Sequence, residues 1–256
     1  MPASHAPLGA VPSPVRFHLR ETDSTNSEAL RRAQAGAEGP FWVTADRQIE
    51  GRGRRGRDWV SESGNLFATL VWPAAELPPE TGRIPLVAAL CAHRTVSAFI
   101  GDTAAVAIKW PNDILCGGGK VCGILAEQHR LADSSLIVIG IGINVASSPA
   151  IAQYPTACLA DHIGAVEVDA VWARLAQDFE DGIALWSKPG GFAEIRRQWL
   201  ERAAGIGERV TIRGHGPSRT GRFVTLSEDG YLVLQRNDGC TDMIASGDVS
   251  FEPDGS

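Results

Sequence analysis

Residues 51–59 read GRGRRGRDW, the stretch of the chain in which positive charge is most concentrated. Its three glycines match the dinucleotide-binding pattern G-x-G-x-x-G letter for letter. That pattern needs a strand before it and a helix that begins on it. A strand-like segment, 41–45, precedes the glycines, but the residues after them are a poor helix start and lead into another strand-like segment, 65–72. The context therefore argues against a dinucleotide fingerprint and favours a loop between two strands.

The chemistry of this loop suits a small anion. Glycines let the backbone curl and expose its N–H groups, and arginines add planar donors that match phosphate and carboxylate oxygens. The whole chain carries a formal net charge of -6, whereas proteins that bind duplex DNA through their general field are usually basic. Two alternatives stay open on composition alone, a solvated basic surface loop and a nucleic-acid-binding patch. With an anion as ligand, we expect the loop to be mobile when empty and ordered when occupied.

Composition bounds the class of protein. The chain has 256 residues, of which 44% are hydrophobic, enough for one large domain or one large and one small. Its five cysteines are scattered without a C-x-x-C pair, which favours reduced thiols in a cytoplasmic protein. Residues 1–14 are proline-rich and lack the order of a signal peptide, so we expect a disordered tail. The longest apolar run, 136–143, is far shorter than the ~20 residues of a membrane helix, and we expect no membrane partner.

Hydrophobic periodicity and turn residues predict strands and helices as far as residue 204. Thr25 and Glu28 have the spacing of a capping box at a helix start, and Gly36 is typical of a helix end. Segment 111–120 reads as turn-rich, and Pro111 keeps Trp110 out of helical geometry, so a strand ends there. The predicted strands are 15–19, 41–45, 65–72, 106–110, 121–129 and 134–145, and the further predicted helices are 82–101, 169–186 and 192–204.

The pattern changes at Gly205. From there the chain has short strand-like segments, and its Asp229-Gly230 and Asp238-Gly239 pairs are typical of hairpin turns. We therefore expect two domains, a larger one over 1–204 and a small all-β domain of barrel type over 205–256.

Five motifs together resemble one family. They are ETDSTN (21–26), QIEGRGRRGRDW (48–59), KWPNDIL (109–115), GGKVCGILAE (118–127) and GIGINV (140–145). In these motifs and their order the chain resembles the biotin protein ligases, which adenylate biotin and transfer it to a lysine of a carboxylase carrier domain. The resemblance implies an α+β fold: a mixed β-sheet catalytic domain flanked by helices, of the class II synthetase-like biotin–lipoate ligase type, with a small C-terminal SH3-like β-barrel.

The resemblance also assigns residues that bind biotin. It implies that the polar residues before and at the first helix contact the biotin head, together with residues of the arginine loop. Lys120 would meet the biotin carboxylate and the forming acyl-phosphate, and Gly123 would let a strand approach the ligand closely. The biotin-binding residues assigned in this way are Ser24, Thr25, Asn26, Gln48, Arg52, Gly53, Arg54, Lys120 and Gly123.

A second set is assigned to ATP. The resemblance implies that Asp113 binds Mg²⁺ and lies near the acceptor lysine, so that Arg54, Asp113 and Lys120 form the catalytic set. Other interpretations of single residues stay open: Asn112 and Asp113 are turn formers, Trp59 could pack in a core, and Asn144 could merely end a strand. The residues assigned to ATP or the adenylate are Arg55, Trp59, Lys109, Asn112 and Asn144.

The implied substrates and partners are biotin, ATP with Mg²⁺, and a biotin carboxyl carrier protein. Only about twenty residues precede ETDSTN, too few for the helix-turn-helix that makes some family members repressors, so we expect no DNA partner. The resemblance is compatible with a homodimer. Two alternatives are kept: a lipoate or octanoate ligase of the same fold, whose acyl group lacks the ureido ring, and a non-catalytic nucleic-acid-binding protein that uses the arginine loop.

Overall fold

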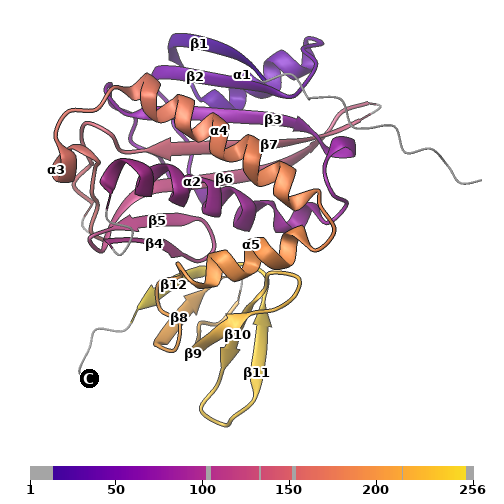
Figure 1. Ribbon diagram of the computed structural model, residues 1–256, viewed down its shortest axis with the longest axis vertical. Helices are drawn as coiled ribbons and strands as arrows, with labels where there is room; N and C mark the ends of the chain where they lie inside the picture. The colour runs from indigo at the N-terminus through magenta and orange to yellow at the C-terminus, as the bar shows by residue number, and fades with distance from the viewer. Residues whose placement is uncertain (1–13, 102–104, 133, 152–153, 215, 252–256) are drawn as a thin grey trace, which may run out of the picture.

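The computed structural model describes residues 14–101, 105–132, 134–151, 154–214 and 216–251, so the tail predicted for 1–14 lies, but for its last residue, outside the described residues. Seven strands form one sheet in the order β1-β2-β3-β7-β6-β5-β4 (Figure 1). Only β1 and β2 run parallel, so the sheet is mixed, as predicted. The strands are β1 (Val15–Thr22), β2 (Phe41–Gln48), β3 (Leu66–Pro73), β4 (Val106–Lys109), β5 (Asp113–Cys116), β6 (Gly119–Arg130) and β7 (Ser135–Ile143).

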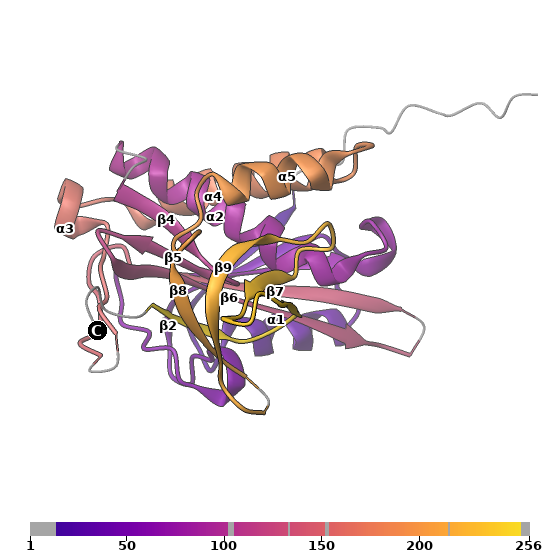
Figure 2. The same cartoon turned by 90° about the horizontal axis from the view of Figure 1, so that it is seen from below.

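Helices cover both faces of this sheet. Helices α2 (Ile84–Ile100) and α4 (Val168–Trp186) lie on one face, and α1 (Thr25–Gln34) lies on the other (Figure 2). Each face has its own apolar cluster, a large one under α2 and α4 and a smaller one under α1. Strands buried on both faces need apolar residues at every position, which explains the continuous apolar runs of β3 and β7.

The remaining helices are short or peripheral. Helix α3 (Ala160–Ile163) was not predicted. Helix α5 (Gly191–Leu200) packs against α2, α4 and the second sheet. It ends before the predicted residue 204, because 202–204 bond instead to the edge of β4: the Ile108 N–H donates to the Arg202 carbonyl, and the Ala204 N–H to the Ile108 carbonyl. Those tertiary bonds replace the helical ones.

The start of α1 corrects the predicted capping box. The residue before the helix is Ser24, and it makes no side-chain cap. The Thr25 hydroxyl donates to the side chain of Gln48 in β2, and the Glu28 carboxylate pairs with Arg31 and Arg32. The capping box is therefore wrong, because partners from a neighbouring strand and from the helix itself take both side chains. Past the other end of the helix, Gly36 has the left-handed conformation (φ 95°) predicted for a helix stop.

Segment 111–120 also differs from its prediction. Strand β4 ends at Lys109, one residue before the predicted end at Trp110, and the turn-rich segment contains β5 and the start of β6. Two of the three glycines, Gly117 and Gly118, form the connection and adopt positive φ values of 55° and 83°, whereas Gly119 begins β6. Antiparallel partners on both sides supply β5 with the hydrogen bonds that its sequence does not signal.

The chain passes from the first sheet to a second one after Gly205. Five antiparallel strands pair in the order β11-β10-β9-β8-β12, and the two predicted Asp-Gly turns join β9 to β10 and β10 to β11. Among the described residues no ladder joins β11 to β12, which have four residues each and lie at opposite edges, so the expected barrel is an open sheet. The strands are β8 (Arg209–Arg213), β9 (Arg219–Leu226), β10 (Leu232–Gln235), β11 (Thr241–Ile244) and β12 (Asp248–Phe251).

One helix is apolar enough to be weighed against a membrane span. The window 81–100, which contains α2, passes that test by length and composition, but 67% of it is buried within the protein. A core helix of a globular protein gives the same result. The described residues contain no other such helix.

Candidate active site

Three glycines form the floor of the site at the centre of the large sheet. Gly123 in β6 pairs with Gly142 in β7, and the indole ring of Trp59 lies against both. A Cβ atom at either glycine would lie 2.7 or 2.5 Å from that ring, too close for any side chain. Gly140 leaves the same kind of space for the side chain of Asn26. Gly123 thus leaves room for a close approach, which Trp59 makes in this structure, and its approach to biotin stays a prediction.

A chain of hydrogen bonds connects the start of α1 to this floor. Gln48 Oε1 accepts from the backbone N–H of Thr25 (2.8 Å) and from its hydroxyl (3.0 Å). The hydroxyl of Thr69 in β3 lies 2.8 Å from the Thr25 hydroxyl and 2.7 Å from Asn26 Oδ1. Gln48 Nε2 donates to Ser61 (2.9 Å). The structure thus brings together three residues predicted to bind biotin, and it adds Thr69 and Ser61, which the sequence analysis missed.

A signal for Thr69 exists in the sequence: it is the one hydroxyl residue in the apolar run of β3. It is fully buried, and a buried hydroxyl needs a hydrogen-bond partner. Ser61 has no comparable signal, because it follows the arginine loop in an irregular segment.

Ser24 is buried immediately before the helix and is held by its neighbour. Its N–H donates to the Asp23 carboxylate (2.7 Å), and that carboxylate also accepts two bonds from Arg31 (2.7 and 2.8 Å). The Arg31 guanidinium keeps the pKa of Asp23 well below its usual range. Asp23 thereby fixes the turn that presents Ser24, Thr25 and Asn26.

The arginine loop is compact. Gly53 N–H donates to the Arg57 carbonyl, and Arg52 and Asp58 form a β-bridge, so the loop closes as a small hairpin. A single 3₁₀ turn, Arg54–Gly56, forms its tip. Arg55 in that turn is the one non-glycine residue with positive φ (58°) in the described part of the chain. Such backbone costs about 1 kcal/mol or more and persists only where other contacts hold it.

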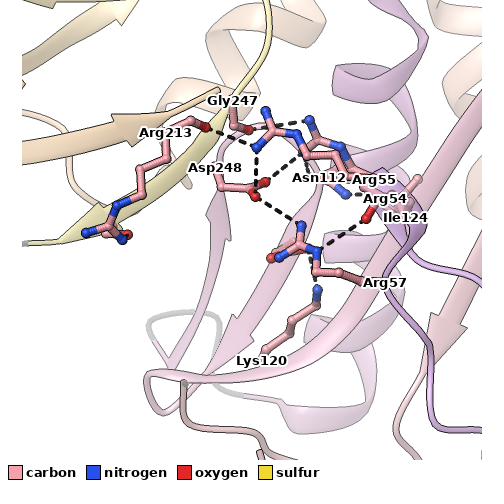
Figure 3. A network of polar contacts seen from close by, with 11 residues as sticks. Arg54, Arg55, Arg57, Asn112, Lys120, Ile124, Arg213, Gly247 and Asp248 are labelled. Carbon is pink, nitrogen blue, oxygen red and sulfur yellow. Dashed lines mark hydrogen bonds and ion pairs between the residues drawn. The ribbon is translucent and has the colours of Figure 1, made fainter. Parts of the chain in front are cut away.

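Those contacts come from the second sheet. The carboxylate of Asp248, the first residue of β12, lies 3.1 Å from Arg55, 3.1 Å from Arg57 and 3.7 Å from Arg54 (Figure 3). Arg55 also donates to the carbonyl of Arg213 (3.2 Å). One carboxylate, 193 residues away from Arg55 in the sequence, therefore offsets the charge of three arginines. Nothing local in the sequence connects these residues.

The KWPND motif contributes two polar side chains to the same region. Asn112 is buried, with Oδ1 accepting from Arg54 (2.6 Å) and Nδ2 donating to the Ile124 carbonyl (2.6 Å). Asp113 forms an ion pair with Lys120 (2.8 Å). Both residues are thus more than turn formers, and Asn112 joins the arginine loop to β6.

Two lysines lie beside this pair. The Lys120 ammonium lies 5.3 Å from the centre of the Trp59 ring and 5.7 Å from that of Tyr154, in addition to its ion pair. Lys109 is the strand partner of Asp113, and its ammonium lies 5.5 Å from the Phe251 ring. Burial lowers the pKa of Lys109, an effect that Asp113 partly offsets. The site therefore gathers cations that a polyanionic substrate would stabilise.

Comparison with known proteins agrees with this geometry. The model of the biotin/lipoate A/B protein ligase family matches residues 19–144, and that of the biotin protein ligase C-terminal domain matches 205–252. The chain is 38% identical to biotin–[acetyl-CoA-carboxylase] ligase of Paracoccus denitrificans, over 85% of this chain and 92% of that protein. The chain belongs to the biotin protein ligase family.

Solved structures of biotin protein ligases have the same fold. The ligase from Aquifex aeolicus in complex with biotin and ATP superposes with a TM-score of 0.80 at 26% identity, covering 93% of this chain and 98% of that one. The ligase from Leishmania major in complex with biotinyl-5-AMP superposes with a TM-score of 0.65, also at 26% identity, covering 91% and 99%.

Asn144 completes the set of residues predicted from this family. Its side chain is buried, and Nδ2 donates to the carbonyls of Ala157 (3.0 Å) and Lys120 (3.3 Å). The amide therefore ties the end of β7 to the segment that passes beside Lys120. Asn144 does more than end a strand, and its contact with adenine stays a prediction.

A groove elsewhere on this biotin protein ligase family member is separate from these residues. It has a volume of about 850 Å³ and lies between the segment after β3, the turn from α4 to α5 and the turn after β9. None of the predicted site residues lines it. The residues predicted to bind the substrates lie elsewhere, so the size of this groove alone is no reason to place the substrates in it.

The described residues hold no group of three or more His, Cys, Asp or Glu side chains that could enclose a metal ion. Magnesium in nucleotide sites needs no such enclosure, because one or two carboxylates suffice when phosphate oxygens and waters complete its shell. Asp113 offers one such carboxylate, and a magnesium ion there would share it with the Lys120 ammonium.

Proposed function

We propose that this protein is an ATP-dependent biotin–protein ligase. It activates biotin to biotinyl-5′-AMP and transfers the biotinyl group to a lysine of a biotin carboxyl carrier protein. The names of the relatives support this proposal, as do the biotin, ATP and biotinyl-5-AMP complexes of structural neighbours. In this chain the proposal rests on the glycine floor of the site. Gly140 lies against the side chain of Asn26. The ring of Trp59 covers Gly123 and Gly142 and lies beside the Lys120 ammonium.

In the first step a carboxylate oxygen of biotin attacks the α-phosphorus of ATP. A new oxygen–phosphorus bond forms, the bond to the β-phosphate oxygen breaks, and pyrophosphate leaves with that electron pair. Both reactants are anionic, so Arg54, Lys109 and Lys120 offset their repulsion and the charge that develops in the transition state. Magnesium bound through Asp113 and phosphate oxygens would supply further charge neutralisation.

In the second step the amine of the carrier lysine attacks the acyl carbon of biotinyl-5′-AMP, and AMP leaves with the electrons of the acyl–oxygen bond. The lysine must lose its proton to become a nucleophile. Asp113 is the carboxylate that would take up this proton, while Lys120, its ion-pair partner, stays beside the substrate. The steps need no covalent enzyme intermediate.

The residue roles follow the same division. Thr25, Gln48 and Ser24 bind the ureido head of biotin, with Arg52 and Gly53 of the loop. Arg55 and Trp59 contact the nucleotide. Three further side-chain amides form hydrogen bonds within the protein, those of Asn26, Asn112 and Asn144. These bonds support a role in shaping the pocket in addition to contact with the ligands.

Location and partners are part of the proposal. Five free thiols, four of them buried, support a reducing compartment, the cytoplasm. The net charge of -6 supports a ligase that does not bind DNA, and a salt titration with duplex DNA would expose any such binding. A homodimer is compatible with the proposal, and sedimentation would measure it.

The decisive experiment incubates the protein with a carrier domain, biotin, ATP and magnesium, and follows the mass of the carrier. One biotinyl group should be added per carrier, and none to a carrier whose acceptor lysine is replaced by arginine. Lipoate and octanoate should support ATP–pyrophosphate exchange poorly, because they lack the ureido ring. Faster exchange with lipoate would replace the biotin assignment, and no exchange with any of the three acids would remove the ligase activity.

A further inference from the structure

Glu127, in the second half of β6, has no part in the steps above. It lies on the same face of the sheet as Gly123, four residues earlier in the strand, because side chains alternate between faces. Its Oε2 accepts from Asn26 Nδ2 (3.2 Å) and from the Arg52 guanidinium (3.3 Å). His129 is a third neighbour, with Nε2 at 3.8 Å. One carboxylate thus touches both α1 and the arginine loop.

We propose that Glu127 is a positioning residue for the biotin head. It acts through Asn26 on one side and Arg52 on the other, and it touches no substrate itself. The inference rests on the proposed function, since it concerns the biotin end of that site.

On the first side, Glu127 fixes a buried amide. Asn26 is 5% exposed, and its Oδ1 accepts from Thr69, so Nδ2 needs an acceptor of its own. Glu127 supplies it, and Gly140 leaves Asn26 no space to shift toward β7 without a clash. A buried donor without a partner is costly, so removing Glu127 should let Asn26 rotate or move the start of α1.

On the second side, Glu127 holds one end of the arginine loop. Asp248 contacts the arginines of the tip, and Glu127 contacts Arg52, which comes before the tip. The two carboxylates therefore hold two ends of one hairpin. Because Arg52 is itself assigned to the biotin head, whereas Arg55 of the tip is assigned to the nucleotide, loss of Glu127 should affect biotin and leave ATP binding almost unchanged.

Two variants separate the two contacts. Glu127→Gln keeps an acceptor for Asn26 and removes the charge opposite Arg52, whereas Glu127→Leu removes both. In biotin-dependent ATP–pyrophosphate exchange, the KM for biotin should rise about two- to fivefold for Gln, as for a part-exposed ion pair. It should rise roughly tenfold or more for Leu, because a buried donor is then unpaired. The KM for ATP and kcat should stay within about twofold, because neither contact is specific to the transition state.

The matched control is Glu194→Gln, which breaks an exposed ion pair with Arg197 on α5, and it should leave all constants unchanged. The background Arg52→Gln tests the route: there, Glu127→Gln should have no further effect on the KM for biotin, while Glu127→Leu should still raise it. The inference would be overturned if Glu127→Gln raised the KM for biotin equally in the wild type and in Arg52→Gln. A Glu127→Leu variant with the wild-type KM for biotin, or equal rises in the KM for biotin and for ATP, would also overturn it. Absence of exchange by the wild type would overturn the proposed function instead.

Discussion

Lys120 has an unusual set of neighbours for a lysine in a glycine-rich hairpin. A lysine after three glycines is normally exposed and dispensable, but here Asp113, Trp59 and Tyr154 surround the ammonium. An ion pair and two aromatic faces hold a charge without removing it, so the ammonium is already in place when an anion enters. Preorganised charge of this kind is what lowers the barrier to a reaction between two anions.

Replacing Lys120 by alanine should therefore impair the formation of biotinyl-5′-AMP more than it impairs folding. Losing one preorganised donor costs roughly 3–4 kcal/mol of transition-state stabilisation, on the order of 10²–10³ in rate. Lys120→Arg should recover only part of this loss, because a planar guanidinium replaces a compact ammonium. Single-turnover assays would measure the rates, with thermal melting as the control for folding. A folded alanine variant within about threefold of wild type would refute a catalytic role.

At the scale of elements, the contact between the arginine loop and β12 makes a specific prediction. Asp248→Asn removes the charge that offsets three arginines and keeps a side chain of the same size. The arginines should then repel one another, and Arg55 should lose a contact that holds its positive φ. Amide hydrogen exchange across 51–57 should accelerate, while β2 should keep its protection. Unchanged exchange in the loop would mean that Asp248 does not anchor it.

The packing of α2 on α4 depends on Gly182. A Cβ atom at this position would lie 2.3 Å from Cys91 Sγ, within a fully buried contact. Gly182→Ala gains helix propensity but overpacks the contact, and we expect a net loss of about 1–2 kcal/mol in the free energy of unfolding. Combining it with Cys91→Ala should recover at least ~1 kcal/mol of that loss, because the clashing sulfur is gone. Urea unfolding of the four proteins measures this coupling, and simple additivity of the two substitutions would exclude the clash.

At the scale of the whole molecule, His93 should make stability depend on pH. Burial lowers the pKa of His93 from 6.5 to about 4, and its ring N–H donates to the Val106 carbonyl. Between these values the unfolded chain binds a proton that the folded protein does not, so stability should fall as pH falls through this window. The expected loss is at most about 3 kcal/mol.

The variant His93→Gln keeps an amide donor for Val106 and does not titrate. Its free energy of unfolding should be lower at neutral pH but less dependent on pH between about 6.5 and 4 than that of the wild type. Urea unfolding at a series of pH values tests this difference. Parallel pH profiles for the two proteins would show that another group is responsible.

The sequence by itself determined the pattern of elements. The apolar run of β3, the β-branched run of β7, the apolar period of α2 and α4, and the Asp-Gly turns of the second sheet each depend on neighbours within a few residues. Local patterns of this kind reflect what a strand or helix must bury, and they can be recognised without a fold. The motifs likewise pointed to Thr25, Gln48 and Lys120, which the structure brings around the glycine floor, although their ligands remain to be tested.

Only the tertiary structure decided what each polar group bonds to. The predicted capping box gave way to Gln48 of strand β2, and the middle of segment 111–120 became strand β5 because β4 and β6 lie on either side of it. No local pattern connects Asp248 or Glu127 with the arginine loop, yet the two carboxylates hold this loop from two different sheets. The physical reason is that burying a charge or an amide requires a partner, and the partner is whichever group the fold brings within about 3 Å, however distant it is in the sequence.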